Sequence, residues 1–310
     1  MVQQAAVIGA GVMGHGIAQL YAQAGIPVFL YDLEENYLEK ARKAIKANLI
    51  LQVQRGVLTE EESERAVACI TYTTDLEEAV RTADFVTEAI PEVIEWKWEL
   101  YEKLESFMKP TAVIASNTST IPVSRLAEKM STPERMMITH FFNPAQLVPL
   151  VEVVRHERTE EKIVQTTMEV MRMIGKSPVL LKKEVPGFIA NRLQAAVVRE
   201  ALHLLEEGVA EAKDIDLAVT EGPGFRWAFI GPIETADFGG LDTWKRVVDN
   251  LAPELSQSRQ APKFLNTLVD AGHLGAKSGQ GIYEYEEISV SEKIKERDDK
   301  FIELLKVKQR

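Results

Sequence analysis

The sequence predicts an α/β fold, with a doubly wound and mostly parallel sheet followed by a second domain made only of helices. Short apolar runs alternate with helical patterns over residues 1–185. Three glycines, at Gly9, Gly11 and Gly14, separate the first apolar run from the first helical pattern. From residue 186 onward the apolar runs typical of buried strands disappear. Alternating strands and helices build a sheet covered on both faces, so we expect domains at 1–185 and 186–310.

The first element is a buried strand over residues 5–8, followed by a glycine turn and a helix that starts near Ile17. The glycine spacing is G-x-G-x-x-G, in which one glycine makes a tight turn, one lets a pyrophosphate approach the backbone, and one lets the helix pack closely on the strand. The N-terminus of the helix then binds phosphates through free N–H groups and its dipole. The pattern predicts a dinucleotide site formed by Gly9, Gly11, Val12, Met13 and Gly14.

Asp32 follows the second apolar run, residues 28–31, and stands 23 residues after Gly9. A carboxylate at this position hydrogen-bonds the ribose hydroxyls of the dinucleotide and repels a 2′-phosphate, so we expect NAD rather than NADP. A second interpretation, Asp32 as the N-cap of the helix that begins near Glu34, is compatible with the first.

The remaining patterns complete both domains. In the first domain we expect helices over 34–54, 60–68, 94–108 and 159–174, and strands over 70–73, 84–87, 112–115, 136–139, 150–154 and 178–181. In the second we expect helices over 188–207, 212–220, 233–250 and 261–271, and a tail, 291–310, that docks on its own chain or on a partner subunit. Ligands of such sheets bind beyond the carboxyl ends of the strands, which selects Glu88, 116–119 and 140–143.

Composition limits the partners. With 36 basic and 47 acidic residues among 310, the net charge is −11, which argues against nucleic acid or an anionic membrane surface as the partner. The single cysteine, Cys69, allows no disulfide framework and no cysteine metal site, and we expect no metal. The first strand begins close to Met1 and no apolar run is long enough to cross a membrane, so we expect a cytoplasmic protein.

His140 is the candidate general base. A nicotinamide site needs a group that accepts the alcohol proton as hydride leaves, and of the five histidines only His140 ends a predicted strand on the cofactor side. Glu152 stands 12 residues later among aliphatic residues of the next strand, where a carboxylate needs a partner. A Glu–His pair would fix the imidazole tautomer and raise its basicity. The alternative is a structural histidine.

Six segments together resemble the L-3-hydroxyacyl-CoA dehydrogenases, including the bacterial 3-hydroxybutyryl-CoA dehydrogenases. They follow the order of that family and span nearly the whole chain: residues 9–14, 116–119, 140–144, 150–153, 186–192 and 274–281.

The resemblance implies the role of each matching residue. His140 matches the catalytic base and Glu152 its partner, while Ser119 and Asn191 match groups that hydrogen-bond the substrate oxygen. Positions that contact NAD match Glu92, Lys97, Asn143 and Lys277. Asn48 and Arg55 fall where the family touches coenzyme A, although neither repeats the most common residue there. The resemblance further implies a short-chain acyl-CoA thioester as substrate, a role in fatty acid metabolism, a homodimer, and an active site in the cleft between the domains.

The segment 222–232 departs from that family. It reads Gly-Pro-Gly-Phe-Arg-Trp-Ala-Phe-Ile-Gly-Pro and, together with residues 147–150, is more similar to the L-gulonate 3-dehydrogenase and lambda-crystallin branch, or to carnitine dehydrogenase. The two phenylalanines after His140, in contrast, resemble the acyl-CoA enzymes. Arg226 in this segment could bind a free carboxylate, which a thioester lacks. Alternatively, Arg226 and Trp227 form a structural stacking pair. A third possibility is a non-catalytic NAD-binding protein, against which the presence of both His140 and Glu152 argues.

Overall fold

The computed structural model describes residues 2–285 and 287–308. The chain divides into two compact units, Met1–Ala190 and Asn191–Arg310, each described below by itself. The second unit therefore begins at Asn191, whereas the sequence led us to expect the boundary after residue 185.

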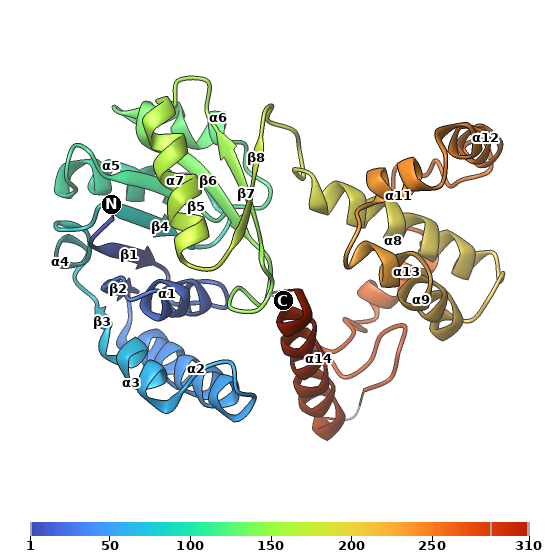
Figure 1. Ribbon diagram of the computed structural model, residues 1–310, viewed down its shortest axis with the longest axis horizontal. Helices are drawn as coiled ribbons and strands as arrows, with labels where there is room; N and C mark the ends of the chain where they lie inside the picture. Colours follow the sequence, from blue (N-terminus) through green and yellow to red (C-terminus); the bar gives the residue numbers. More distant parts are fainter. Residues whose placement is uncertain (1, 286, 309–310) are drawn as a thin grey trace. The chain divides into compact units, whose positions relative to one another are not determined.

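The first unit is built on an eight-stranded sheet (Figure 1). The strands β3-β2-β1-β4-β5-β6 are all parallel, β7 is antiparallel to β6, and β8 is parallel to β7. The predicted mostly parallel, doubly wound sheet is thus confirmed, with a reversal at its β7–β8 end. The bounds are β1 Ala5–Ile8, β2 Val28–Tyr31, β3 Ile70–Thr73, β4 Phe85–Glu88, β5 Val113–Ser116, β6 Met136–Phe141, β7 Leu150–Arg155 and β8 Ser177–Leu181.

Seven α-helices of the first unit cover the sheet. They are α1 Gly14–Gln23, α2 Glu35–Gln54, α3 Glu60–Ala68, α4 Leu76–Val80, α5 Ile94–Phe107, α6 Val123–Leu126 and α7 Glu161–Met173. Thr59 caps α3 with a capping box that includes Glu62, and Asp75 caps α4. The sequence did not predict α4 and α6, because helices of five and four residues are too short to show a helical period.

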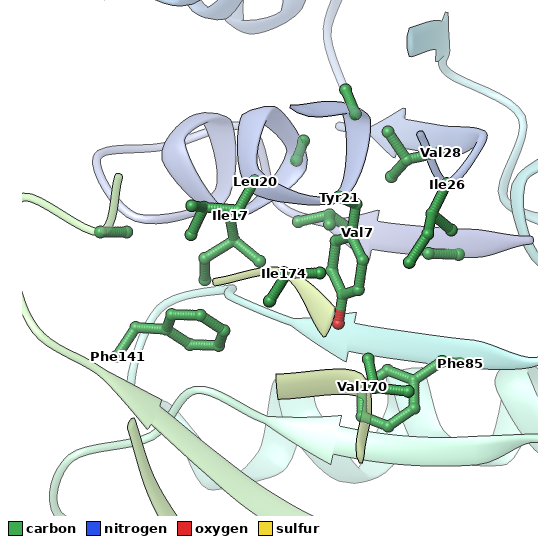
Figure 2. Close-up of a cluster of buried hydrophobic side chains, with 14 of the residues drawn as sticks. Val7, Ile17, Leu20, Tyr21, Ile26, Val28, Phe85, Phe141, Val170 and Ile174 are labelled. Carbon is green, nitrogen blue, oxygen red and sulfur yellow. The ribbon is translucent and has the colours of Figure 1, made fainter. Parts of the chain in front are cut away.

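The sheet has a hydrophobic core on each face, because successive residues of a strand point to opposite sides. Val7 faces α1, α2, α3 and α7, whereas Ile8 faces α4, α5 and α6. Figure 2 shows the first of these cores, where Tyr21 of α1 lies among apolar side chains from β1, β4 and α7. The buried hydroxyl of Tyr21 lies 2.9 Å from Thr87 Oγ1. The two cores hold the strands in register and so fix where the strand ends lie.

The second unit is helical, as predicted. Its helices are α8 Ala190–Glu206, which begins at the last residue of the first unit, α9 Ala212–Glu221, α10 Pro223–Trp227, α11 Pro232–Phe238, α12 Leu241–Leu251, α13 Lys263–Asp270 and α14 Glu287–Lys308. The single helix expected over 233–250 is wrong: Gly240 has a φ of 88° and separates α11 from α12, because only glycine adopts that backbone readily.

The expected tail forms most of α14, which begins at Glu287; residues 309 and 310 lie outside the described part of the chain. Ile302 on this helix is buried, whereas Ile294 is exposed. Within the described ranges, no helix combines the length and the apolar character needed to cross a membrane.

Candidate active site

The three fingerprint glycines meet three different steric demands. Gly9 has a φ of 103°, and a Cβ there would lie 2.7 Å from the Ala89 carbonyl oxygen. A Cβ on Gly14 would lie 1.7 Å from the Gly9 carbonyl oxygen, so the start of α1 packs closely on the turn. A Cβ on Gly11 would meet no atom within 4 Å. The open space at Gly11, next to the N-terminal turn of α1, is what the approach of a pyrophosphate requires.

Asp32 lies beside this turn. Its Oδ2 accepts a hydrogen bond of 2.7 Å from the Ala10 amide, and its Oδ1 accepts one of 2.8 Å from the Leu33 amide. The N-cap residue of α2 is Glu34, so the N-cap interpretation of Asp32 is wrong. The end of β2 instead holds a carboxylate against the glycine turn, in the place where the ribose of a dinucleotide binds. These residues fit NAD.

His140 and Glu152 are direct partners across β6 and β7. His140 Nδ1 lies 2.9 Å from Glu152 Oε2, and both residues are buried. A carboxylate only accepts hydrogen bonds, so Nδ1 carries the proton and the lone pair remains on Nε2. The ring of His140 also packs against Phe142 and Phe188, with centroid distances of 4.5 and 5.4 Å. The pair that the sequence suggested is therefore formed, and it leaves Nε2 as the basic atom.

The second oxygen of Glu152 has two partners that the sequence did not reveal. Its Oε1 accepts hydrogen bonds of 2.8 Å from the amides of Ile189 and Ala190. Burial alone would raise the pKa of Glu152, but the hydrogen bonds from His140 and from these two amides outweigh burial and hold the pKa below its ordinary value. Glu152 thus stays ionised next to the imidazole.

Glu92 organises the segment that follows β5. Its Oε1 accepts hydrogen bonds from the Ser119 amide at 2.8 Å and from the Ser119 hydroxyl at 3.3 Å. Both carboxylate oxygens lie 2.9 Å from the Thr118 hydroxyl, which donates to them. Asn117 Oδ1 accepts from the Phe141 amide at 2.9 Å, which joins this segment to the residue after His140. Glu92, Ser119 and His140 therefore all lie at the carboxyl edge of neighbouring strands.

Glu88, which we expected at the ligand edge, is a buried structural carboxylate with no exposed surface. It accepts hydrogen bonds from Lys97 Nζ at 2.6 Å, Tyr101 at 2.7 Å, Ser116 at 2.6 Å and the Ile90 amide at 2.8 Å. These four donors leave it nothing to offer a ligand, so the expectation for Glu88 is wrong.

Lys97 is 1% exposed, and its Nζ lies 3.6 Å from Glu92 Oε2 in addition to its bond to Glu88. Its contact with NAD stays a prediction.

Asn143 is exposed in the segment that joins β6 to β7, and the peptide bond between Asn143 and Pro144 is cis.

Asn48 belongs to a chain of amide side chains between α1 and α2. Its Nδ2 donates to Gln19 Oε1 at 3.1 Å, Gln19 donates to Gln23 at 3.2 Å, and Gln23 donates to Gln52 at 2.6 Å. These bonds give the buried side chains of Gln19 and Gln52 hydrogen-bond partners, as buried polar groups require. Arg55, the other residue expected near coenzyme A, is the C-cap residue of α2.

Three predicted site residues belong to the second unit. Asn191 lies in the first turn of α8 and directly follows Ala190, whose amide is held by Glu152. Arg226 is exposed on α10. Lys277 lies in the loop that follows α13, where Gly275 and Gln280 form an isolated bridge.

A group of three or more residues able to hold a metal ion is absent from the described residues.

Comparison with known proteins identifies both parts of the chain. Residues 4–185 match the domain family "3-hydroxyacyl-CoA dehydrogenase, NAD binding domain", and residues 187–285 match "3-hydroxyacyl-CoA dehydrogenase, C-terminal domain". The probable 3-hydroxybutyryl-CoA dehydrogenase of Bacillus subtilis is 37% identical over 287 residues, which cover 92% of this chain and 98% of the relative. The L-carnitine dehydrogenase of Streptomyces coelicolor is 36% identical over 312 residues, covering 98% and 94%.

A solved structure is also similar over nearly the full length. It is a 5-formyl-3-hydroxy-2-methylpyridine 4-carboxylic acid 5-dehydrogenase, described as an NAD⁺ dependent dismutase, with a TM-score of 0.92 and 33% identity over 99% of this chain and 98% of that chain. The expected cofactor, NAD, is confirmed by the matching NAD binding domain and by this neighbour. Since domain families match both parts of the chain, it belongs to the 3-hydroxyacyl-CoA dehydrogenase family and is an NAD-dependent dehydrogenase.

Proposed function

We propose that the chain catalyses the reversible, NAD-linked oxidation of a short-chain L-3-hydroxyacyl-CoA to the 3-ketoacyl-CoA. The observation that supports this most is the buried His140–Glu152 pair at the carboxyl edge of the sheet that carries the glycine turn. NAD supplies the hydride acceptor, so that one alcohol and one NAD⁺ give one ketone, one NADH and one proton. The relatives that act on 3-hydroxybutyryl-CoA support the thioester.

The protein residues handle the proton. His140 Nε2 removes the proton of the 3-hydroxyl group, because Nδ1 already donates to Glu152. The ionised Glu152 stabilises the resulting imidazolium and prevents the ring from rotating. We propose that Ser119 and Asn191 hold the substrate oxygen, and that Asn143, Lys97 and Lys277 contact the cofactor.

A substitution of His140 tests this mechanism. His140→Ala should lower kcat by roughly 10²–10⁴, the usual contribution of a general base, while NADH binding and the thermal unfolding midpoint remain near those of the wild type. His156→Gln is the matched control, because His156 lies after β7 and outside the proposed site. Near-full turnover by a folded His140→Ala protein that binds NADH would overturn the mechanism.

A second candidate substrate is a free hydroxy acid, and three observations favour it. In sequence, the L-carnitine dehydrogenase relative covers 98% of the chain, whereas the Bacillus thioester relative covers 92%. The C-terminal domain family ends at residue 285, before α14. Asn48, at a position expected to touch coenzyme A, is already bonded to Gln19. With a free hydroxy acid as substrate, Arg226 binds its carboxylate.

A substrate panel separates the two candidates. Acetoacetyl-CoA with NADH is compared with 3-hydroxybutyrate, L-carnitine and L-gulonate with NAD⁺, following NADH absorbance. Higher kcat/KM for the thioester supports the first candidate, and higher kcat/KM for a free acid replaces it with the second. Arg226→Ala should raise KM for a free acid by roughly tenfold or more, since a lost charged hydrogen bond costs about 1.5–3 kcal/mol; it should leave KM for a thioester almost unchanged.

We infer a homodimer from the family, and a cytoplasmic location from the single cysteine, which suits a reducing compartment. Exposed apolar side chains on α8, including Leu193 and Val198, support an interface on the second unit. Light scattering on the purified protein tests this, and a monomeric mass at micromolar concentration would contradict it.

A further inference from the structure

Lys176 is a buried lysine without an acidic partner in the described part of the chain. It follows Gly175, between α7 and β8, and is 7% exposed. Its Nζ donates hydrogen bonds to two backbone carbonyls, that of Ala145 at 2.5 Å and that of Val148 at 2.8 Å. Burial lowers its pKa to about 7. A buried cation that serves only backbone carbonyls is costly, and an apolar side chain would fill the same space more cheaply.

The two carbonyls belong to residues 142–149, the loop that joins β6 to β7. Leu147 and Val148 both donate their amides to the Pro144 carbonyl at 3.0 Å, so the loop closes in a tight turn. The carbonyls that Lys176 binds, those of Ala145 and Val148, precede and follow Leu147 in the loop. The neighbouring Ser177 amide donates to the Pro149 carbonyl at 2.8 Å. The start of β8 therefore fastens the loop at three carbonyls.

The same loop connects two parts of the active site. It begins two residues after His140 and ends three residues before Glu152, and it carries Asn143. On its other side it packs against Gly16 in the first turn of α1. A Cβ on Gly16 would lie 2.8 Å from Gln146 Oε1 and 3.2 Å from Ala145 Cβ. The loop thus contacts the first turn of the helix that follows the glycine fingerprint.

We propose that Lys176 is a positioning residue, whose ammonium group holds the 142–149 loop against α1 so that Asn143 and His140 keep the geometry required by the nicotinamide. The role of Asn143 in this proposal rests on the proposed function. The effect of Lys176 on how firmly the loop is held does not. A shift of about 1 Å in such a support can cost about 10²-fold in rate.

The experiment compares Lys176→Met, which keeps an unbranched side chain one atom shorter and removes the donors, with Lys176→Arg, which keeps donors and charge. Lys109→Met is the matched control, because Lys109 binds Asp84 just before β4, at the amino edge of the sheet. Hydrogen exchange of the 142–149 peptide is measured without cofactor, followed by NADH affinity by titration and by kcat and KM. Lys176→Met should raise loop exchange and the NADH Kd by roughly tenfold and lower kcat by roughly 10- to 100-fold.

Lys176→Arg should recover part of each loss, and Lys109→Met should leave loop exchange and NADH affinity at wild-type values. Wild-type loop exchange and NADH affinity in folded Lys176→Met would overturn the proposal. If Lys176→Met does not fold, Lys176→Gln replaces it, because glutamine retains N–H donors without the charge. Lys176→Gln should raise loop exchange and the NADH Kd and lower kcat, each by less than Lys176→Met would. If none of these changes is observed, the proposal is overturned. A wild-type protein that binds NADH but oxidises no 3-hydroxy substrate would refute the proposed function, while the exchange measurement still decides the role of Lys176.

Discussion

Glu152 lies directly opposite His140 across antiparallel strands, with its Oε2 2.9 Å from His140 Nδ1. Its other oxygen accepts the amides of Ile189 and Ala190, the residues that lead into α8. One buried carboxylate therefore orients the base and also fixes the chain just before Asn191. The loss of its charge should affect catalysis more than folding.

Glu152→Gln tests that expectation. The amide keeps the shape of the side chain but does not stabilise the imidazolium, so kcat should fall by roughly 10²–10⁴. The measurement is steady-state kinetics with the best substrate of the panel, accompanied by thermal unfolding. Glu161→Gln removes a carboxylate that pairs with Arg155 outside the site and should keep wild-type kcat. Wild-type turnover by Glu152→Gln would show that the pair does not serve the proton transfer.

Gly11 and Gly14 should respond differently to alanine. Gly11→Ala meets no protein atom within 4 Å, so the protein should unfold at the wild-type temperature but bind NADH roughly tenfold more weakly, a loss of about 1.4 kcal/mol. Gly14→Ala places a Cβ 1.7 Å from the Gly9 carbonyl oxygen and should destabilise the fold by about 1–3 kcal/mol. Calorimetric titration and thermal unfolding measure both. A Gly11→Ala protein with unchanged NADH affinity would place the pyrophosphate elsewhere.

Thr139, next to His140, is fully buried, and its Oγ1 lacks a hydrogen-bond partner within the described residues. Thr139→Val removes this unsatisfied hydroxyl at constant shape and should raise the free energy of unfolding by about 1 kcal/mol. Thr159→Val is the control, because Thr159 Oγ1 donates to the Met136 carbonyl and accepts from the His156 amide; it should lower the free energy of unfolding by about 1 kcal/mol or more. Urea unfolding at neutral pH measures both, and a loss in Thr139→Val would indicate an unseen partner.

Lys176 should make stability depend on pH. Burial lowers its pKa from 10.5 to about 7 in the folded state, so between these values the folded protein binds fewer protons than the unfolded chain. The contribution of this group to the free energy of unfolding therefore rises with pH from about 7 to about 10.4 and is constant below that window. Lys176→Met should lack this rise. Urea unfolding of both proteins at several pH values tests the sign, and parallel curves would contradict the lowered pKa.

The sequence by itself determined the elements whose signals are local. The glycine spacing and the strand before it predicted the first strand, turn and helix, because the start of the helix can pack on the Gly9 carbonyl only if residue 14 lacks a Cβ, and Gly9 lies five residues earlier in the same motif. The strands ending at Ser116 and Leu181 were visible as apolar runs between turn residues. The pairing of His140 with Glu152 followed from the cost of a buried carboxylate.

Tertiary structure alone decided the polar contacts that no sequence pattern marked. From its position in the sequence we expected Glu88 at the ligand edge, but Lys97, Tyr101, Ser116 and the Ile90 amide all donate hydrogen bonds to it and use its capacity. Lys176 and the Ala145 carbonyl are 31 residues apart, and no pattern in either segment marks their contact. Local sequence sets backbone conformation through sterics and hydrogen bonds between near neighbours, whereas hydrogen bonds between distant side chains depend on how the strands and helices pack.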